Sequence, residues 1–373
     1  MIHPEQLYNF FQEKGIHFFT GVPDSLLKHF LKYINDNAAE ADHIITANEG
    51  LAIGLASGYH FRTGNIPLVY LQNSGLGNII NPLTSLADKE IYSVPMILLI
   101  GWRGKPGTED EPQHKKMGKI LLYLLTVLDI PFFILEPDEE ISFKKINEAI
   151  EMASLEKMPV ALIAAEEIFE KYTGKDEPGN YSLVREDVIK KIIGAMNGDE
   201  QVVCTTGKIG REFYEQNKSA GNKISKYFLS VGAMGHANHI ALGVHDKTKT
   251  IMLDGDGAIL MHLGSLATIA KHAKDNFIHI VINNGSHESV GGQPTAAFDM
   301  DCCALAKACG YKKTFCLSSE PELESWLQDN FNDSTTQFVE IRTNRFSRAD
   351  LGRPEGNPID WKENFMKAIK KKN

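Results

Sequence analysis

The strongest constraint on the fold is one segment of the C-terminal half, residues 251–293, in which two apolar strands flank a helix-forming stretch. The first strand is predicted to end at Leu253, just before the turn Gly255-Asp256-Gly257. A helix is predicted from about residue 258 to 273, and a second strand from about 277 to 282 precedes two asparagines. Such a unit places two parallel strands side by side. Their carboxyl ends then lie on the edge where α/β sheets bind ligands.

The polar residues that follow these two strands are predicted to converge on a cation. Asp256 offers a carboxylate, Asn284 an amide oxygen, and the backbone near Ser286 a carbonyl oxygen. Mg²⁺ prefers such oxygen ligands together with phosphate oxygens. The glycines and the helix amino terminus favour a phosphate close to the backbone. The alternative is a simple capped turn, because Gly-Asp-Gly alone is common in turns.

Glu49 is the candidate acid of the N-terminal half. It follows a strand predicted to end near Ala47, and it opens a helix with glycines at four-residue spacing, Gly50, Gly54 and Gly58. A glycine inside a helix costs about 1 kcal/mol relative to alanine. The glycine stripe therefore indicates that another backbone packs closely against this face. For Glu49 taken alone, the alternative is a first-turn acid favoured by the helix dipole.

Together, the Gly-Asp-Gly…Asn-Asn run and the Glu-Gly-x-Ala pattern resemble the two halves of thiamine-diphosphate (ThDP) enzymes. The resemblance covers essentially the whole chain. It implies that Glu49 protonates the aminopyrimidine of ThDP, and that Asp256, Asn284 and Ser286 hold Mg²⁺ and the diphosphate.

The resemblance also implies the domain organisation. Short apolar segments alternate with amphipathic helices in both halves, which predicts an α/β protein with two parallel-sheet domains. Residues 1–172 are expected to form the pyrimidine-binding domain, 173–180 a linker, and 181–373 the diphosphate-binding domain. The chain has no room for the middle domain that many ThDP decarboxylases carry.

Further site residues are implied by the loops that match the family. Asp24 and His114 are candidate catalytic groups, although Asp24 and Ser25 are equally good helix N-caps. Met234 matches the apolar residue that supports the bent cofactor. The remaining residues expected to contact the cofactor are Asn73, Ser74, Gly75, Gly232, Gly235, His236, Gly255, Gly257 and Ala258.

The short form without a middle domain resembles decarboxylases of phosphonopyruvate and of sulfopyruvate. Fusion of the two halves and the segment GGQPT favour phosphonopyruvate, with sulfopyruvate or another 2-oxo acid as alternatives. The products would be phosphonoacetaldehyde and CO₂, a reaction of phosphonate biosynthesis. Cations expected to meet the second anionic group are Arg103, Lys105, Lys115, Arg348 and Arg353, with Ser25 beside them. Solvated surface charge is the alternative for these residues.

Charge and composition exclude several other classes. The net charge of −9 argues against a nucleic-acid partner. No apolar run approaches roughly 18 residues, so no membrane span is expected. The amino terminus lacks a signal-peptide pattern, and the five cysteines form no CxxC pair. We therefore expect a cytoplasmic protein with reduced thiols.

An oligomer and two rival functions complete the sequence-based expectations. The glycine stripe and the habit of ThDP enzymes predict at least a homodimer with active sites between subunits. A ThDP-binding subunit without catalysis is one rival, and Glu49 argues against it. A nicotinamide dehydrogenase is the other, and the lack of G-x-G-x-x-G after the first strand disfavours it.

Overall fold

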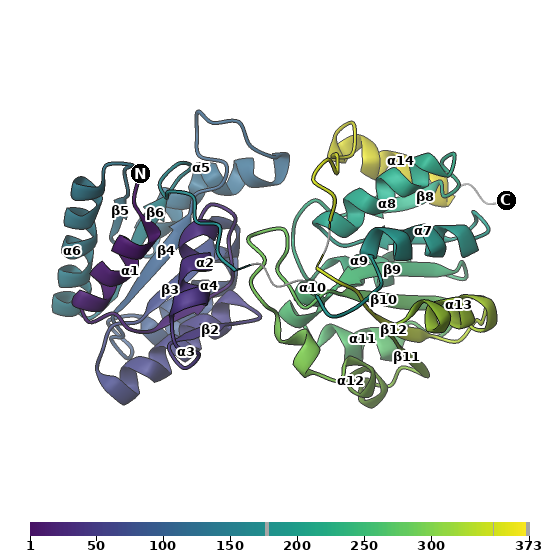
Figure 1. Cartoon of the computed structure of the whole chain (residues 1–373), viewed down its shortest axis with the longest axis horizontal. Coiled ribbons are helices and arrows are strands. Elements are labelled where there is room, and N and C mark those ends of the chain that lie inside the picture. Colours follow the sequence, from purple (N-terminus) through teal and green to yellow (C-terminus); the bar gives the residue numbers. More distant parts are fainter. Residues whose placement is uncertain (176–178, 346, 371–373) are drawn as a thin grey trace. The chain divides into compact units, whose positions relative to one another are not determined.

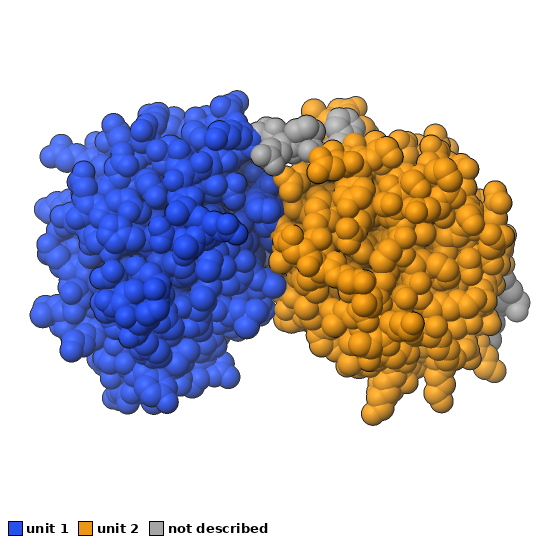
Figure 2. Space-filling model, turned by 60° about the horizontal axis from the view of Figure 1, so that its bottom comes forward, with its two compact units in different colours: residues 1–176, 287–294 blue, residues 177–286, 295–373 orange. Residues whose placement is uncertain are grey.

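The computed structural model describes residues 1–175, 179–345 and 347–370. The chain forms two compact units, residues 1–176 with 287–294 and residues 177–286 with 295–373, which Figure 2 shows in different colours. Each unit contains one six-stranded sheet with helices on both faces (Figure 1). The predicted α/β class with two parallel-sheet domains and no middle domain is confirmed. Part of the predicted linker 173–180, residues 176–178, lies outside the described residues.

The sheet of the first unit has the strand order β2-β1-β3-β4-β6-β5, and every pair is parallel. Its strands are β1 (Phe19–Gly21), β2 (His43–Ile45), β3 (Leu68–Gln72), β4 (Met96–Gly101), β5 (Phe132–Ile134) and β6 (Pro159–Ala164). The helical elements are α1 (Pro4–Glu13), α2 (Lys28–Asn37), α3 (Glu49–Thr63), η1 (Asn73–Gly75), α4 (Leu76–Pro82), η2 (Leu83–Ala87), α5 (Pro112–Val127) and α6 (Glu139–Glu156).

Alternating side chains of the buried strands build one core on each face of this sheet. Along β4, Ile97 and Leu99 face the core formed with α1, α2 and α6, whereas Leu98 and Ile100 face the core formed with α3, α4 and α5. The period of two follows from the pleat of a strand. Because both faces are covered, the strands are apolar throughout, as expected of a parallel sheet.

The sheet of the second unit has the order β11-β12-β10-β9-β7-β8, again with parallel pairs only. Its strands are β7 (Gln201–Cys204), β8 (Lys226–Leu229), β9 (Thr250–Gly255), β10 (Phe277–Asn283), β11 (Lys313–Leu317) and β12 (Gln337–Arg342). Its helical elements are α7 (Arg185–Ala195), α8 (Lys208–Ser219), α9 (Ala237–Val244), α10 (Asp256–Met261), α11 (Ser265–His272), η3 (Ala296–Asp299), α12 (Cys302–Cys309), α13 (Glu320–Asp329) and α14 (Pro358–Lys370).

The two sheets share one connection order. In the first, the chain runs from β1 to its neighbour β2 and then crosses back to β3 on the other side of β1. In the second, β7, β8 and β9 follow the same path. Each sheet therefore has a switch point, between β1 and β3 and between β7 and β9. Ligands of open α/β sheets bind beyond the strand ends at such points.

One predicted helix is wrong. The sequence predicts a single helix over residues 258–273, whereas the structure has α10 followed by α11. The backbone leaves the helical region at His262, with φ −139° and ψ 59°. The ring of His262 lies 4.6 Å from that of His236, centroid to centroid, in the loop that precedes α9. The break therefore follows from a tertiary contact that a local pattern does not contain.

The expectation of reduced thiols is wrong for two of the five cysteines. Cys303 of α12 and Cys316 of β11 form a disulfide, with their Cα atoms 6.3 Å apart. This separation lies within the range that a disulfide can bridge. The other three, Cys204, Cys302 and Cys309, are free. None of the helices in the described part of the chain combines the length and hydropathy needed to cross a membrane.

Candidate active site

Glu49 is the first residue of α3 and is 5% exposed. The preceding residue, Asn48, caps the helix by accepting a hydrogen bond from the Gly50 amide at 2.8 Å. The Asn78 side chain donates to Glu49 Oε2 at 2.7 Å. Burial raises the pKa of Glu49 above its ordinary value, and the bond from Asn78 opposes this only in part. A carboxyl group in this state is suited to sharing a proton with a ring nitrogen. The sequence analysis did not identify Asn78.

Gly75 leaves the space that the Glu49 carboxyl group occupies. A Cβ atom built on Gly75 would lie 2.3 Å from Glu49 Oε1. The neighbouring Gly77 has open space around its own Cβ position. The absence of a side chain at Gly75 therefore allows the carboxyl group of Glu49 to lie where it does, whereas the contact of Gly75 with the cofactor stays a prediction.

Asp24 lies at the switch point of the first sheet and is fully buried. Its Oδ2 accepts a hydrogen bond from Gln72 Nε2 at 2.7 Å, and its Oδ1 accepts one from the Leu26 amide at 3.0 Å. Gly101 makes room for this carboxyl group, since a Cβ there would lie 2.0 Å from Asp24 Oδ1. Burial raises the pKa of Asp24 despite these bonds. Neither Asp24 nor Ser25 caps α2, whose N-cap is Leu27.

The loop between β4 and α5 contains a cluster of charges centred on Asp110, which the sequence analysis missed. Asp110 accepts hydrogen bonds from Arg103 Nε at 2.8 Å and from His114 Nδ1 at 2.9 Å. Arg103 Nη1 also donates to Ser25 Oγ at 2.8 Å. Burial opposes ionisation of Asp110, but the bonds from Arg103, His114 and the Gly104 amide outweigh it and lower its pKa well below the usual range. Asp110 therefore compensates the charge of Arg103 and orients His114.

The other predicted residues of this sheet edge differ in their burial and in their contacts. Asn73 uses its side-chain amide to bind the backbone of Arg103, donating to the carbonyl at 2.7 Å. Ser74 is exposed and donates to Gln72 Oε1 at 2.7 Å. Lys105 lies with its ammonium 5.6 Å from the centroid of the Trp102 ring, and Lys115 is exposed on α5. Neither lysine forms an ion pair with a carboxylate of the described residues.

In the second unit, the two predicted strand ends come together as expected. Asp256, Asn284 and Ser286 are all buried. Thr295 Oγ1 donates to Asp256 Oδ2 at 2.5 Å, and the Ser286 amide donates to Asn284 Oδ1 at 3.2 Å. Burial raises the pKa of Asp256 to about 6, although the bond from Thr295 opposes the shift. The sequence analysis missed Thr295, and the only local signal was its place at the end of GGQPT.

This oxygen-rich group has the composition of a magnesium site. It offers a carboxylate and an amide oxygen, both ligands that Mg²⁺ accepts. The hydroxyl oxygen of Ser286 is buried and has no hydrogen-bond partner among the described residues. A buried hydroxyl without a partner is costly unless a ligand satisfies it. The residues present therefore fit a hydrated cation that carries phosphate oxygens.

The loop between β8 and α9 packs against this site. Ala233 and Gly235 have positive φ angles of 52° and 85°. A Cβ on Gly235 would lie 2.7 Å from His262 Cδ2 and 3.1 Å from the carbonyl oxygen of Ala258. Gly235 therefore lets the loop approach the first turn of α10, and it places the adjacent, half-buried Met234 in this loop.

Two histidines lie in or near this loop, His236, which the sequence analysis selected, and His262, which it did not. His236 is exposed, and its Nδ1 lies 3.1 Å from the carbonyl oxygen of Met234. His262 has a buried Nε2 without a hydrogen-bond partner in the structure, so it is a candidate donor to a diphosphate. The sequence analysis did not select His262, because the predicted continuous helix concealed its position.

Glycines and small residues complete the predicted cofactor set. Gly255 ends β9, and a Cβ there would lie 3.3 Å from Ile209 Cδ1. Gly257 and Ala258 belong to the first turn of α10. Gly232 follows β8, and its carbonyl oxygen accepts a hydrogen bond from Ser230 Oγ at 2.7 Å.

The two arginines predicted near the C-terminus, Arg348 and Arg353, have different surroundings. Arg348 pairs with three carboxylates, those of Glu186, Glu215 and Asp350, so its charge is already compensated. Arg353 lies exposed in the segment before α14. The arginine that reaches the loop after β10 is instead Arg345, whose Nη2 donates to the Gly285 carbonyl oxygen at 3.4 Å. The substrate roles of Arg348 and Arg353 stay predictions.

Comparisons with known proteins identify the class to which this fold and these residues belong. Residues 4–120 match the N-terminal TPP binding domain of thiamine pyrophosphate enzymes, and residues 204–341 match the C-terminal one. Thiamine pyrophosphate is another name for ThDP. The chain therefore belongs to the thiamine pyrophosphate enzymes.

Whole-length relatives narrow the class further. The chain is 32% identical to phosphonopyruvate decarboxylase of Streptomyces hygroscopicus, over 94% of this chain and 90% of the relative. It is 33% identical to that of Streptomyces viridochromogenes, over 95% and 92%. It is 27% identical to sulfopyruvate decarboxylase of Methanosarcina acetivorans, over 86% of each. Within the family, the chain is a carboxy-lyase.

We predict that Gly75→Ala impairs catalysis by displacing Glu49. The added methyl group would overlap the carboxyl group, and a displacement of about 1 Å at a reacting group typically costs about 100-fold in rate. The measurement is hydrogen–deuterium exchange at the thiazolium carbon of added ThDP, together with CO₂ release. Gly77→Ala is the matched control and should behave as the wild type. Equal exchange in both variants would contradict the positioning role of Gly75.

Proposed function

We propose that this protein decarboxylates 3-phosphonopyruvate to phosphonoacetaldehyde and CO₂, with ThDP and Mg²⁺. The observation that carries the proposal is the similarity to two phosphonopyruvate decarboxylases over 94–95% of the chain. The identity to the sulfopyruvate relative is lower, 27% over 86%. Lys105, in the loop after β4 on the same sheet edge as Asp24 and Glu49, supports a substrate with a second anionic group.

The second unit would hold the cofactor through the loop after β10, residues 284–286, which we call the metal loop. Asp256 and Asn284 would bind Mg²⁺ through side-chain oxygens, with Ser286 as the third ligand. The buried, unpaired Ser286 hydroxyl and His262 nitrogen support this assignment, because both lack a partner in the structure. Met234 would support the bent conformation. When bound, ThDP supplies the electron sink for cleavage of the carbon–carbon bond.

The first unit would supply the acids. Glu49 would share its proton with the pyrimidine ring nitrogen, which its raised pKa favours. For the proton delivered to the product carbon, we favour Asp24 over His114. Asp24 is fully buried with a raised pKa, so it retains a proton to higher pH than an exposed carboxyl group. His114 is bound to the ionised Asp110 and would act as an orienting contact for the substrate.

Lys105 is the cation best suited to bind the phosphonate. The charge of Arg103 is compensated by Asp110, and its position is fixed by Ser25. Lys105 contacts an aromatic ring and no carboxylate among the described residues, so its charge is available to a ligand. A phosphonate carries about one more negative charge than a sulfonate near neutral pH, and a compact ammonium group with three donors suits its oxygens.

The direct test is CO₂ release from three acids in the presence of ThDP and Mg²⁺. We expect phosphonopyruvate to be turned over far faster than sulfopyruvate or pyruvate. Omission of ThDP, or removal of Mg²⁺ with a chelator, should abolish turnover. A preference for sulfopyruvate would assign the protein to the alternative substrate. Turnover of pyruvate alone would exclude both anionic substrates.

We predict that Lys105→Gln reduces kcat/KM for phosphonopyruvate by about 10-fold or more, because a charge-assisted bond is worth about 1.5–3 kcal/mol. Turnover of pyruvate, which has no phosphonate, should change little. The matched control is Lys144→Gln, which removes the same charge from an exposed position on α6. Equal losses for both acids would show that Lys105 supports folding or the cofactor instead.

We predict that Asp256→Ala loses ThDP binding. Removing the only carboxylate proposed as a magnesium ligand should weaken affinity by at least about 100-fold, since even outer-shell partners are worth 10–100-fold. Calorimetry of ThDP binding at saturating Mg²⁺ provides the measurement. Asp299→Ala, which removes an exposed carboxylate from η3 of the same unit, is the control. Unchanged affinity in Asp256→Ala would exclude this metal assignment.

We also propose a homo-oligomer in which Glu49 of one chain faces Asp256 of another. The exposed face of α3 supports this idea. Gly54 and Gly58 have nothing within 4 Å of their Cβ positions, and Leu51 and Phe61 are 61% and 59% exposed. No described residue of the chain therefore requires glycine at positions 54 and 58, whereas a second chain packed on α3 would.

We predict that Glu49→Gln and Asp256→Ala, each inactive alone, recover activity when mixed. In a random mixture half of the dimers contain both variants and carry one intact site of two, so roughly a quarter of wild-type activity should return. The measurement is CO₂ release after subunit exchange verified by mass-tagged chains. No recovery despite proven exchange would place both residues of a site in the same chain.

A further inference from the structure

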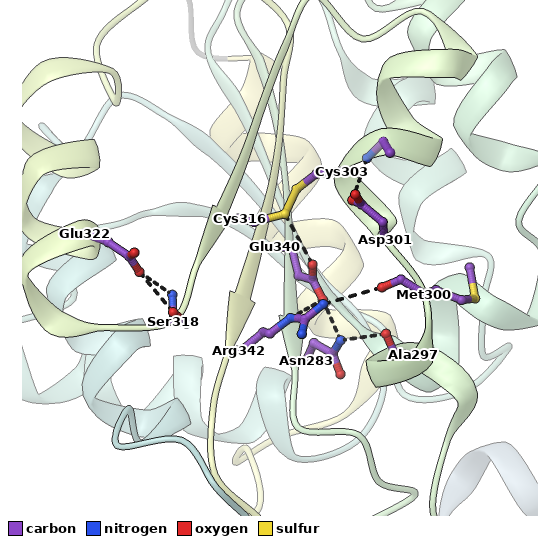
Figure 3. The surroundings of a disulfide bond; sticks show 11 residues. Asn283, Ala297, Met300, Asp301, Cys303, Cys316, Ser318, Glu322, Glu340 and Arg342 are labelled. Atoms are coloured by element: carbon purple, nitrogen blue, oxygen red, sulfur yellow. Dashed lines mark hydrogen bonds and ion pairs between the residues drawn. A yellow bond between two sulfur atoms is a disulfide. The ribbon is translucent and has the colours of Figure 1, made fainter.

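The disulfide joins two elements beside the metal loop of the second unit. Cys303, in α12, is buried, whereas Cys316, on β11, is exposed. Figure 3 shows the bond between them. Because β11 is an edge strand, its outer side has no neighbouring strand. A thiol at Cys316 is accessible to an external reagent. The buried thiol of Cys303 would then react with the modified Cys316 and re-form the disulfide. The disulfide is therefore open to attack from solvent on the side of Cys316.

A buried carboxylate connects the disulfide to the metal loop. Cys316 Sγ lies 3.5 Å from Oε2 of Glu340, a residue of β12 with no exposed surface. The other oxygen, Oε1, accepts hydrogen bonds from Asn283 Nδ2 at 2.7 Å and from Arg342 Nε at 3.2 Å (Figure 3). Asn283 Oδ1 in turn accepts the Gly285 amide at 2.9 Å. These contacts fix the turn that carries the proposed magnesium ligand after Asn283.

A second connection runs through the backbone between Thr295 and Cys303. Thr295 binds the carboxylate of Asp256, and the segment then forms η3 and enters α12. Arg342 Nη2 donates to the Met300 carbonyl oxygen at 3.4 Å, which ties this segment to β12 (Figure 3). The disulfide at Cys303 therefore anchors one end of a short segment whose other end contacts the metal site.

We propose that Cys303 and Cys316 form a reversible thiol–disulfide site that controls the affinity of the second unit for the magnesium–diphosphate group. The effect on affinity rests on the proposed function, whereas the modification itself does not. Three observations favour this pair: Cys316 is an exposed residue, Cys303 is a buried one, and Cys316 contacts Glu340 of the network around the metal loop.

The chemistry balances as thiol–disulfide exchange with a small disulfide such as oxidised glutathione. The Cys316 thiolate attacks one sulfur of that disulfide, which forms a mixed disulfide and releases one glutathione thiolate. The Cys303 thiolate then attacks the Cys316 sulfur and releases the second. Two protein thiols lose two electrons and two protons, and the external disulfide is reduced to two thiols. Reduced glutathione in excess drives the reverse reaction.

The two states differ in the contact with Glu340 and in the freedom of α12. In the disulfide, the Cys316 sulfur carries no proton and cannot donate to the carboxylate, but the covalent link holds α12 against β11. Reduction removes the link and leaves only a weak S–H donor toward Glu340. The segment 295–303 then gains freedom, so the oxidised form should bind the magnesium–diphosphate group more tightly. Partners of this outer-shell kind are worth about tenfold or more in metal affinity.

The other half-buried or buried cysteines of this region are less suited to exchange. Cys302, next to Cys303, is 3% exposed, and burial raises its pKa to about 12. It therefore stays protonated near neutral pH and is a poor nucleophile. Cys309, at the end of α12, provides a control position because it is a free cysteine of the same helix.

The first experiment maps the modification in the purified full-length chain. The protein is equilibrated with glutathione mixtures of defined ratio, its thiols are blocked by alkylation, and the peptides are analysed by mass spectrometry. We expect residues 303 and 316 to be protected together in oxidising mixtures and alkylated together in reducing ones. Cys309→Ser should titrate as the wild type, and Cys316→Ser should lose the transition. Thiols that stay alkylated in every mixture would overturn the proposal.

Reduced thiols beside Glu340 could alternatively bind a soft metal, since the three groups lie within 4.8 Å of one another. Reduced protein is therefore also incubated with Zn²⁺ alone. Stoichiometric uptake of zinc that blocks oxidation in every glutathione mixture would overturn the exchange assignment in favour of a metal site. Oxidation that proceeds with Zn²⁺ present supports it.

The second experiment measures the consequence. Hydrogen–deuterium exchange of residues 283–303 and calorimetry of ThDP with Mg²⁺ are compared between the two states. We expect faster exchange and about tenfold weaker ThDP affinity after reduction, and no difference between conditions in Cys316→Ser. Identical exchange and affinity in both states would overturn the control of affinity. A protein that binds no ThDP in either state would refute the proposed function, and the exchange data would then still decide whether the disulfide orders the segment.

Discussion

Parallel strand pairing is the constraint on which the rest of the structure depends. Every pair in both sheets is parallel, so the loops that follow the strands of one sheet all leave the same edge. In the first sheet this edge brings together residues at or just after the carboxyl ends of β1, β3 and β4, namely Asp24, Gln72 and Arg103. In the second it brings together Asp256 and Asn284. Polar residues that lie far apart in the sequence are thereby brought together at one edge of each sheet. No local sequence motif longer than a few residues is needed for this.

Concentrating buried carboxyl groups has an energetic cost in the cofactor-free protein. Burial raises the pKa of Asp24, Glu49 and Asp256. A group with a raised pKa binds its proton more tightly in the folded state. Its contribution to stability is therefore lost as pH rises from the unfolded-state pKa through the folded-state value. For Asp256 this window ends at about pH 6. The proposed magnesium ion would favour the ionised form of Asp256 and would so offset this cost.

The sequence predicted the fold class, the alternation of strands and helices in both halves, and the convergence of the two strand ends in the second unit. Local patterns suffice for these features, because periodicity and turn residues are local. Asp110, Thr295 and the break at His262 could not be predicted, since each depends on where a distant loop packs. The bond between Cys303 and Cys316 was missed for the same reason. The two residues lie on a helix and a strand that only the tertiary fold brings together.

The shared strand order of the two units places different residues at corresponding positions of the two sheets. The loops after β3 and β4 correspond to those after β9 and β10. In the first unit these positions hold Asn73 and Arg103, which bind each other, and Arg103 also pairs with Asp110. In the second they hold Asp256 and Asn284, which present oxygen ligands. Because neither set alone provides both a proton-sharing acid and a metal site, the proposed decarboxylation requires one copy of each unit. Fusion in a single chain supplies them in equal number.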